Sequence, residues 1–88
     1  MNNDFLISES EIIKLQSYWP SLSKQEALCF HLISIGFTRK DIASKLGSSK
    51  NSIDKTMYRI AEKLETTIDQ LRSIYLNRLL FLILSTYH

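Results

Sequence analysis

Apolar residues recur every three or four positions along most of the 88-residue chain, which is the spacing that buries one face of an α-helix. Five stretches carry this pattern: about 9–18, 24–35, 39–46, 50–64 and a last one that begins near residue 67. Only two glycines and one proline interrupt the chain, which favours long helices over a turn-rich β fold. We therefore predict an all-α fold, a small helical bundle.

Residues suited to begin and end helices stand at the edges of these stretches. A serine or threonine side chain can accept a hydrogen bond from a free amide of the first helical turn. The predicted N-caps are Ser8, Ser23, Thr38, Ser49 and Thr66 or Thr67. A Glu or Gln three positions after the cap completes a capping box, and the residues that can do so are Glu11, Glu26 and Gln70. The predicted helix ends are Pro20, Gly36 and Gly47.

Residues 38–64 combine a short helical pattern, a tight turn and a longer helical pattern. Gly47 suits the turn, because glycine enters the left-handed backbone conformation without steric cost. The apolar positions of each pattern fall on one face; they are Ile42, Ala43 and Leu46 in the first and Ile53, Met57, Ile60, Ala61 and Leu64 in the second. Two helices joined by a few glycine and serine residues form a helix-turn-helix pattern.

Positive charge is concentrated on this helix-turn-helix stretch. The whole chain carries a net charge of +2, but residues 38–63 hold seven basic and three acidic residues, so that stretch carries +4 and the remainder carries −2. The polar face of the second helix holds Lys50, Asn51, Asp54, Lys55, Tyr58, Arg59, Glu62 and Lys63. Such a helix fits the major groove of B-DNA, and clustered basic residues are typical of proteins that bind a phosphate backbone. The alternative is an ordinary solvated helix face.

The N-terminal segment 1–21 is predicted to be an extension with a short amphipathic helix. Residues 1–7 are expected to be frayed; the alternative is that the apolar residues Phe5, Leu6 and Ile7 dock on the domain. No basic segment followed by an apolar run is present at this end, so a signal peptide is not expected. Trp19, at the end of the helix, is predicted to plug the core; a contact with a partner is the alternative.

The last helical stretch becomes apolar on every side. Residues 79–84 are six consecutive apolar residues, far fewer than the roughly 20 that span a bilayer. One stripe can pack on the domain, so we predict that the stretch from about Tyr75 to Tyr87 forms a homodimer interface. The expected interface residues are Tyr75, Leu76, Leu79, Leu80, Ile83 and Leu84. The alternative is that this end packs back on Ile12, Leu15 and Trp19 of the same chain.

Four segments occur in the order and spacing of a known family's motifs. They are LSKQE at 22–26, GFTRKDIA at 36–43, LGSSKNSID at 46–54 and IAEKL at 60–64. In this register, which needs no gap, about half of the chain resembles the LuxR/GerE-type helix-turn-helix domain of bacterial transcription regulators. The corresponding family motifs are Leu-Thr-x-Arg-Glu, Gly-x-Ser-Asn-Lys-Glu-Ile-Ala, Leu-x-Ile-Ser-x-x-Thr-Val-Lys and Ile-x-x-Lys-Leu. The chain departs from the family pattern at Gln25, Leu28, Ser48, Asp54 and Thr56.

The resemblance implies that the helix 50–64 is the recognition helix, which lies in the major groove. The base-reading residues that it implies, with Asn51 added for its place near the helix start, are Asn51, Asp54, Lys55 and Tyr58. The implied phosphate contacts are Arg39, Lys40, Ser49, Lys50, Ser52, Arg59 and Lys63. An aspartate at position 54 repels phosphates, but it can accept a hydrogen bond from cytosine N4 or pair with Lys50 or Tyr58. The last helix of the family commonly mediates dimerisation, which agrees with the predicted interface.

Other kinds of site find no support in the sequence. Cys29 is the only cysteine, so no internal disulfide is possible, which suits a reducing cytoplasm. His31 lies two positions away and faces another direction, so no zinc site is predicted. No catalytic constellation and no Gly-rich phosphate loop can be assembled. We therefore expect a cytoplasmic protein that is not an enzyme and needs no cofactor or metal.

Two functions follow from these patterns. The first is a sequence-specific transcription regulator that binds double-stranded DNA as a homodimer. Its single domain would comprise an N-terminal extension (1–21), a helix-turn-helix core (22–65) and a C-terminal dimerisation helix (66–88). The second is a protein-interaction module whose apolar last helix pairs with another regulator and modulates it. The further protein partners that these functions allow are another transcription regulator and RNA polymerase; no membrane partner is expected.

Overall fold

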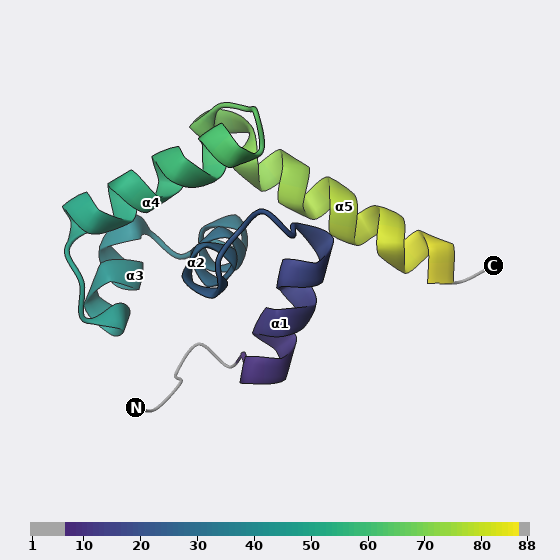
Figure 1. Ribbon diagram of the computed structural model, residues 1–88, viewed down its shortest axis with the longest axis horizontal. Helices are drawn as coiled ribbons and strands as arrows, with labels where there is room; N and C mark the ends of the chain where they lie inside the picture. The colour runs from purple at the N-terminus through teal and green to yellow at the C-terminus, as the bar shows by residue number, and fades with distance from the viewer. Residues whose placement is uncertain (1–6, 87–88) are drawn as a thin grey trace.

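A computed structural model describes residues 7–86 as a series of helices joined by short loops (Figure 1). The elements are α1 (Glu9–Tyr18), α2 (Lys24–Ser34), α3 (Arg39–Leu46), α4 (Lys50–Lys63), the 3-10 helix η1 (Ile68–Gln70) and α5 (Leu71–Thr86). No strand occurs in this part of the chain, and the predicted all-α fold is confirmed. The expectations for residues 1–6 and for Tyr87 lie outside the described residues.

Helix α2 lies at the centre of the fold and contacts α1, α3, α4 and α5. Figure 1 shows it nearly end-on, with α3 and α4 on one side and α5 leading away on the other. Its sequence explains this position, because apolar residues cover most of its circumference. The core residues that it contributes, each at most 1% exposed, are Ala27, Cys29, Phe30 and Leu32. A helix of this kind has to be covered on several sides.

Helix α1 covers one side of α2. It buries Ile12 and Leu15, which lie one turn apart on the same face. Ile7, just before the helix, is only 6% exposed and belongs to the same core. The expectation that residue 7 is frayed is therefore wrong, because its apolar side chain is buried against the helices.

Most of the predicted helix caps are present. Ser8 and Ser23 each accept a hydrogen bond from the backbone amide of the glutamate three positions later, and that glutamate accepts one in return, so both capping boxes are complete. Thr38 and Ser49 cap α3 and α4. Thr67 stands at the N-cap position of η1, but its side chain makes no capping hydrogen bond, so the predicted capping box with Gln70 is absent. The backbone amide of Gln70 instead donates a hydrogen bond to the Thr67 carbonyl at 3.1 Å. This bond belongs to the tight 3-10 turn that precedes α5.

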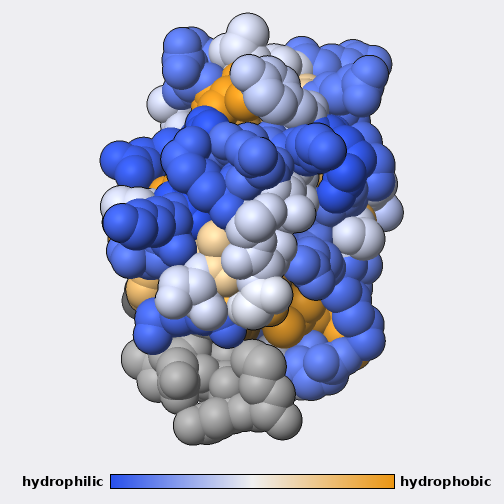
Figure 2. All heavy atoms as spheres, turned by 90° about the vertical axis from the view of Figure 1, so that its left-hand side faces the viewer, coloured by the Kyte–Doolittle hydropathy of each residue, from blue (hydrophilic) through white to orange (hydrophobic). Residues whose placement is uncertain are grey.

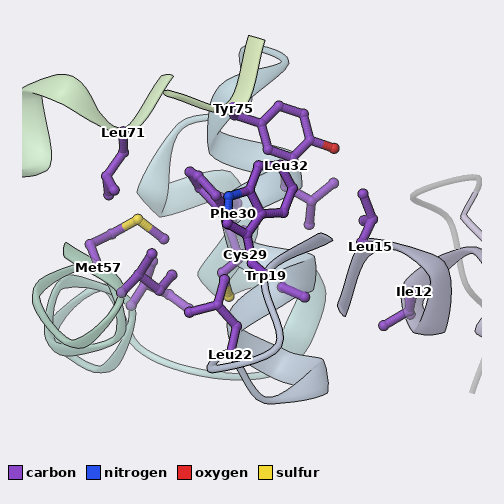
Figure 3. Close-up of a cluster of buried hydrophobic side chains, with 14 of the residues drawn as sticks. Ile12, Leu15, Trp19, Leu22, Cys29, Phe30, Leu32, Met57, Leu71 and Tyr75 are labelled. Atoms are coloured by element: carbon purple, nitrogen blue, oxygen red, sulfur yellow. The ribbon is translucent and has the colours of Figure 1, made fainter. Parts of the chain in front are cut away.

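Three stacked or edge-on aromatic rings join α1, α2 and α5 (Figure 3). The ring centroid of Trp19 lies 4.9 Å from that of Phe30 and 5.1 Å from that of Tyr75. Phe30 and Tyr75 meet edge-on at 5.0 Å. Trp19 is only 5% exposed, so the prediction that it plugs the core is confirmed.

Tyr75 belongs to this core, which corrects the prediction that it lies in a dimer interface. Its side chain is completely buried, and its hydroxyl is hydrogen-bonded to Nδ1 of His31. Burial raises the pKa of Tyr75 to about 12. Leu71, one turn earlier on the same face of α5, is also buried. The first half of α5 therefore packs back on the same chain, as the alternative interpretation expected, and Leu79 is half-buried against this core.

From Leu76 onward, the outer side of α5 is largely uncovered by the described residues. Large apolar side chains that are between 46% and 67% exposed follow one another along it; they are Leu76, Leu80, Phe81, Ile83 and Leu84. This helix and the others of the described region are too short or too polar to cross a bilayer. Exposed apolar surfaces of this kind are typical of interaction sites.

Candidate nucleic-acid interface

Helices α3 and α4 are fixed against the core by their apolar faces, and this orientation turns the polar face of α4 outward. Ile42 of α3 and Ile53, Met57 and Ile60 of α4 are each at most 1% exposed. Between the helices, Gly47 has a φ of +66°, the left-handed conformation that the sequence predicts there. Figure 2 shows this side of the molecule and the hydrophilic residues that cover most of it.

Three of the four predicted base-reading residues project from α4 without a partner among the described residues. Asn51, Lys55 and Tyr58 are exposed, and Tyr58 is 67% exposed although it carries a large aromatic ring. An aromatic ring left in water is available for contact with a ligand. These side chains recur at three- or four-residue spacing, so they share one face of the helix.

Asp54, the fourth predicted base-reading residue, is engaged in two ion pairs. Its Oδ1 accepts a hydrogen bond from Nη1 of Arg39 at 2.9 Å, and its Oδ2 accepts one from Nζ of Lys50 at 3.1 Å. These two bonds, the one from Arg39 first, hold the pKa of Asp54 below its usual value. Its side chain is only 24% exposed. Of the two pairings considered from the sequence, the one with Lys50 is therefore present, and Arg39 is a partner that the sequence did not indicate.

The predicted phosphate contacts near the start of α4 lie close to one another. Ser49 accepts a hydrogen bond from the Ser52 amide at 3.1 Å and donates one to the Ser52 hydroxyl at 3.1 Å. Lys50 and Lys40 are exposed at the N-terminal ends of α4 and α3. Backbone amides at a helix start favour an anion, so the exposed amides and hydroxyls at the start of α4 suit a phosphate.

Two further predicted phosphate contacts, Arg59 and Lys63, are tied to helix α2. Nζ of Lys63 lies 2.7 Å from Oε1 of Glu26, and Nε of Arg59 lies 3.5 Å from Oε2 of the same carboxylate. Sequence reasoning assigned Glu26 only to a capping box and missed this clamp between α2 and α4. The signal was an acidic residue on a helix that is apolar around most of its circumference; such a residue has to find a partner when it is buried.

The charge of Glu26 should contribute to stability near neutral pH. Burial acts to raise its pKa, but hydrogen bonds from Lys63, the Ser23 amide and Arg59 outweigh burial, and the pKa is lowered. A lowered pKa means that the stabilisation is present above the unfolded value of about 4.3 and is lost as the pH falls below it.

We expect Glu26→Gln to lower the free energy of unfolding at pH 7 by about 1–2 kcal/mol, because hydrogen bonds to a charged group are lost. Urea unfolding at several pH values should show the difference from the wild type shrinking below about pH 4. Glu9→Gln is the matched control, because its ion pair with Lys24 is exposed to solvent and should contribute little. A Glu26→Gln protein as stable as the wild type at pH 7 would contradict the clamp.

The remaining reactive side chains do not assemble into a site. Cys29 is buried, which raises its pKa to about 11 and leaves the thiol protonated and unreactive at neutral pH. His31 has a lowered pKa because burial disfavours its charged form. Among residues 7–86, no three His, Cys, Asp or Glu side chains are placed to hold a metal ion.

Comparison with known proteins agrees with this geometry. A family model described as bacterial regulatory proteins, luxR family, matches residues 20–71. The match covers more than half of the chain and runs from the loop before α2 through the helix-turn-helix to the first residue of α5. No curated protein and no solved structure matches the chain. The chain therefore belongs to the luxR family of bacterial regulatory proteins and carries the DNA-binding helix-turn-helix of a transcription regulator.

Proposed function

We propose that this protein is a cytoplasmic transcription regulator that binds specific sequences of double-stranded DNA as a homodimer, with α4 as the recognition helix in the major groove. The observation that carries the proposal is the outer face of α4, where Asn51, Lys55 and Tyr58 project from a helix whose opposite face is locked in the core. A rigid helix with free donors on its outer face suits readout of base edges. The family membership supports the DNA-binding part of the proposal.

The residues around this face divide into two roles. Asn51, Lys55 and Tyr58 would read bases together with Asp54; asparagine pairs with adenine and lysine with guanine in the major groove. Lys40, Ser49 and Ser52 would contact phosphates near the starts of α3 and α4. Lys50 would do so only after leaving Asp54. Arg39 would reach a phosphate only after leaving Asp54, and Arg59 and Lys63 only by sharing their charge with Glu26.

Dimerisation would use the exposed stripe of α5. Leu76, Leu80 and Ile83 follow one another at intervals of four and three residues, which is the spacing of the buried seam between two paired helices. A second copy of the same stripe gives a self-complementary contact. Two such domains would present two recognition helices to two half-sites on one face of the DNA.

We expect Lys55→Ala to weaken binding to a selected target duplex by about 1–3 kcal/mol and to relax the preference for the base that Lys55 contacts. Selection from a random-sequence library followed by fluorescence anisotropy on single-base variants measures both effects. Lys40→Ala should instead weaken all sequences alike, because a phosphate contact carries no sequence information.

Lys14→Ala, which removes the same charge from exposed α1, is the control and should leave binding almost unchanged. If Lys55→Ala left affinity and base preference intact, the assignment of α4 as the reading helix would be wrong.

A second candidate function is a protein-interaction module that pairs with a larger regulator and modulates it. Two observations favour it: the uncovered apolar half of α5 and the neutralisation of Arg39 and Lys50 by Asp54. Purified protein with no DNA affinity, which co-purifies with a larger regulator through α5, would support this function. A stable homodimer that binds DNA by itself would exclude it.

A further inference from the structure

The carboxylate of Asp54 forms ion pairs with Arg39 and Lys50. Both of these cations belong to the proposed contact with the DNA backbone. Arg39 is the first residue of α3 and Lys50 is the first residue of α4, and each of them bonds one oxygen of the same carboxylate, at 2.9 and 3.1 Å. The ion pair between Arg39 and Asp54 is partly shielded, since their side chains are 32% and 24% exposed. The two cations and the carboxylate together carry a charge of +1 instead of +2.

The Asp54 carboxylate is chemically similar to a phosphate as a partner for these cations. Both groups are anions with several acceptor oxygens, and arginine binds either of them through the same donors. A DNA backbone that approaches α3 and α4 therefore competes with a partner that is already in place. Every ion pair that persists in the complex also removes one cation from the count of phosphates that the protein can neutralise.

We propose that Asp54 is an internal competitor for phosphate, which keeps Arg39 and Lys50 from binding arbitrary DNA and so determines the specificity of the interface. The proposal rests on the DNA-binding function proposed above and assigns to one residue the control of its selectivity. DNA without a suitable base meets an interface whose charge is partly neutralised. A base that donates a hydrogen bond to Asp54, as cytosine N4 does, gives the carboxylate another partner, and Arg39 and Lys50 are released to the backbone.

The test compares the wild type with Asp54→Asn on a duplex of mixed sequence, by fluorescence anisotropy over a series of salt concentrations. Asparagine has nearly the same shape but no charge, so both cations become available. We expect binding about tenfold tighter or more at 50 mM salt, and a slope of log K against log salt that is steeper by about 0.9 for each cation released. Thermal unfolding followed by circular dichroism establishes that both proteins are folded.

Glu62→Gln is the matched control. It removes one negative charge from the exposed side of the same helix, and Glu62 has no ion pair among the described residues. If the gain came only from weaker repulsion of DNA, Glu62→Gln would give it too; we expect its effect to be several times smaller. In the Arg39→Ala, Lys50→Ala background, Asp54→Asn should lose most of its effect, because no cation is left to release.

The outcomes separate this inference from the proposed function. If Asp54→Asn binds mixed-sequence DNA no better than the wild type, or more weakly and with a shallower salt slope, Asp54 positions the cations for phosphate instead of withholding them. That result overturns the inference and leaves the DNA-binding function standing. If neither protein binds DNA at low salt, the proposed function fails and the inference fails with it.

Discussion

Replacing Tyr75 with alanine is expected to lower the free energy of unfolding by about 3–5 kcal/mol, the usual cost of removing a buried aromatic side chain. The ring is completely buried and contacts both Trp19 and Phe30. Its loss leaves a cavity where α1, α2 and α5 meet. Because small domains are stable by only about 5–15 kcal/mol, this change removes a large part of the total. Urea unfolding followed by Trp19 fluorescence measures it.

Tyr75→Phe is the matched control and keeps the ring while it removes the hydroxyl that bonds His31. It should cost only about 1 kcal/mol, the net value of one hydrogen bond. If Tyr75→Ala does not fold at all, the Phe variant still distinguishes packing from hydrogen bonding. An alanine variant as stable as the wild type, with only its self-association weakened, would place Tyr75 in an interface and contradict the fold described above.

Replacing Leu80 with aspartate is expected to abolish dimerisation while the monomer stays folded. Leu80 is 55% exposed in the single chain and lies at the middle of the stripe Leu76, Leu80 and Ile83. Each dimer would carry the change twice, and each copy would lose about 1.5–3 kcal/mol of leucine burial and force a carboxylate into an apolar contact. The dissociation constant should rise more than about a thousandfold. Sedimentation equilibrium measures the change directly.

Ile13→Asp provides the comparison for Leu80→Asp. Ile13 on α1 is 51% exposed, so this variant also replaces an exposed apolar residue with a charge, but it does so away from the stripe of α5. It should dimerise like the wild type. A wild-type protein that remains monomeric at high concentration, or a Leu80→Asp protein that remains dimeric, would show that α5 does not form the interface.

The helices and their starts could be predicted because local interactions determine them. Ser8, Ser23, Thr38 and Ser49 cap their helices in the structure as expected, and a capping hydrogen bond involves residues only three positions apart. Gly47 adopts its left-handed conformation for an equally local reason. By contrast, Glu65 adopts a φ of +56° after α4. A glutamate gives no sign in the sequence of this left-handed conformation.

The sequence suggested the local pairing of Lys50 with Asp54, but it could not predict the interactions of the candidate site that join residues far apart. Arg39 and Asp54 are 15 positions apart, and Glu26 and Lys63 are 37 apart. Helical spacing tells which residues share a face of one helix, but it does not give the angle at which two helices pack. For the same reason, the spacing of apolar residues predicted that Tyr75 and Leu80 lie in one apolar helix, but it did not predict which of the two side chains faces α2.

The central claim is that the protein binds double-stranded DNA through α4 and its surroundings. The most direct test titrates a fluorescent mixed-sequence duplex with the wild-type protein and follows the anisotropy. A dimer with six or more phosphate contacts should lose about a thousandfold or more in affinity between 50 and 200 mM salt. Binding with that salt dependence is the result we predict. The absence of binding at the lower salt concentration, or binding that does not change with salt, would contradict the claim.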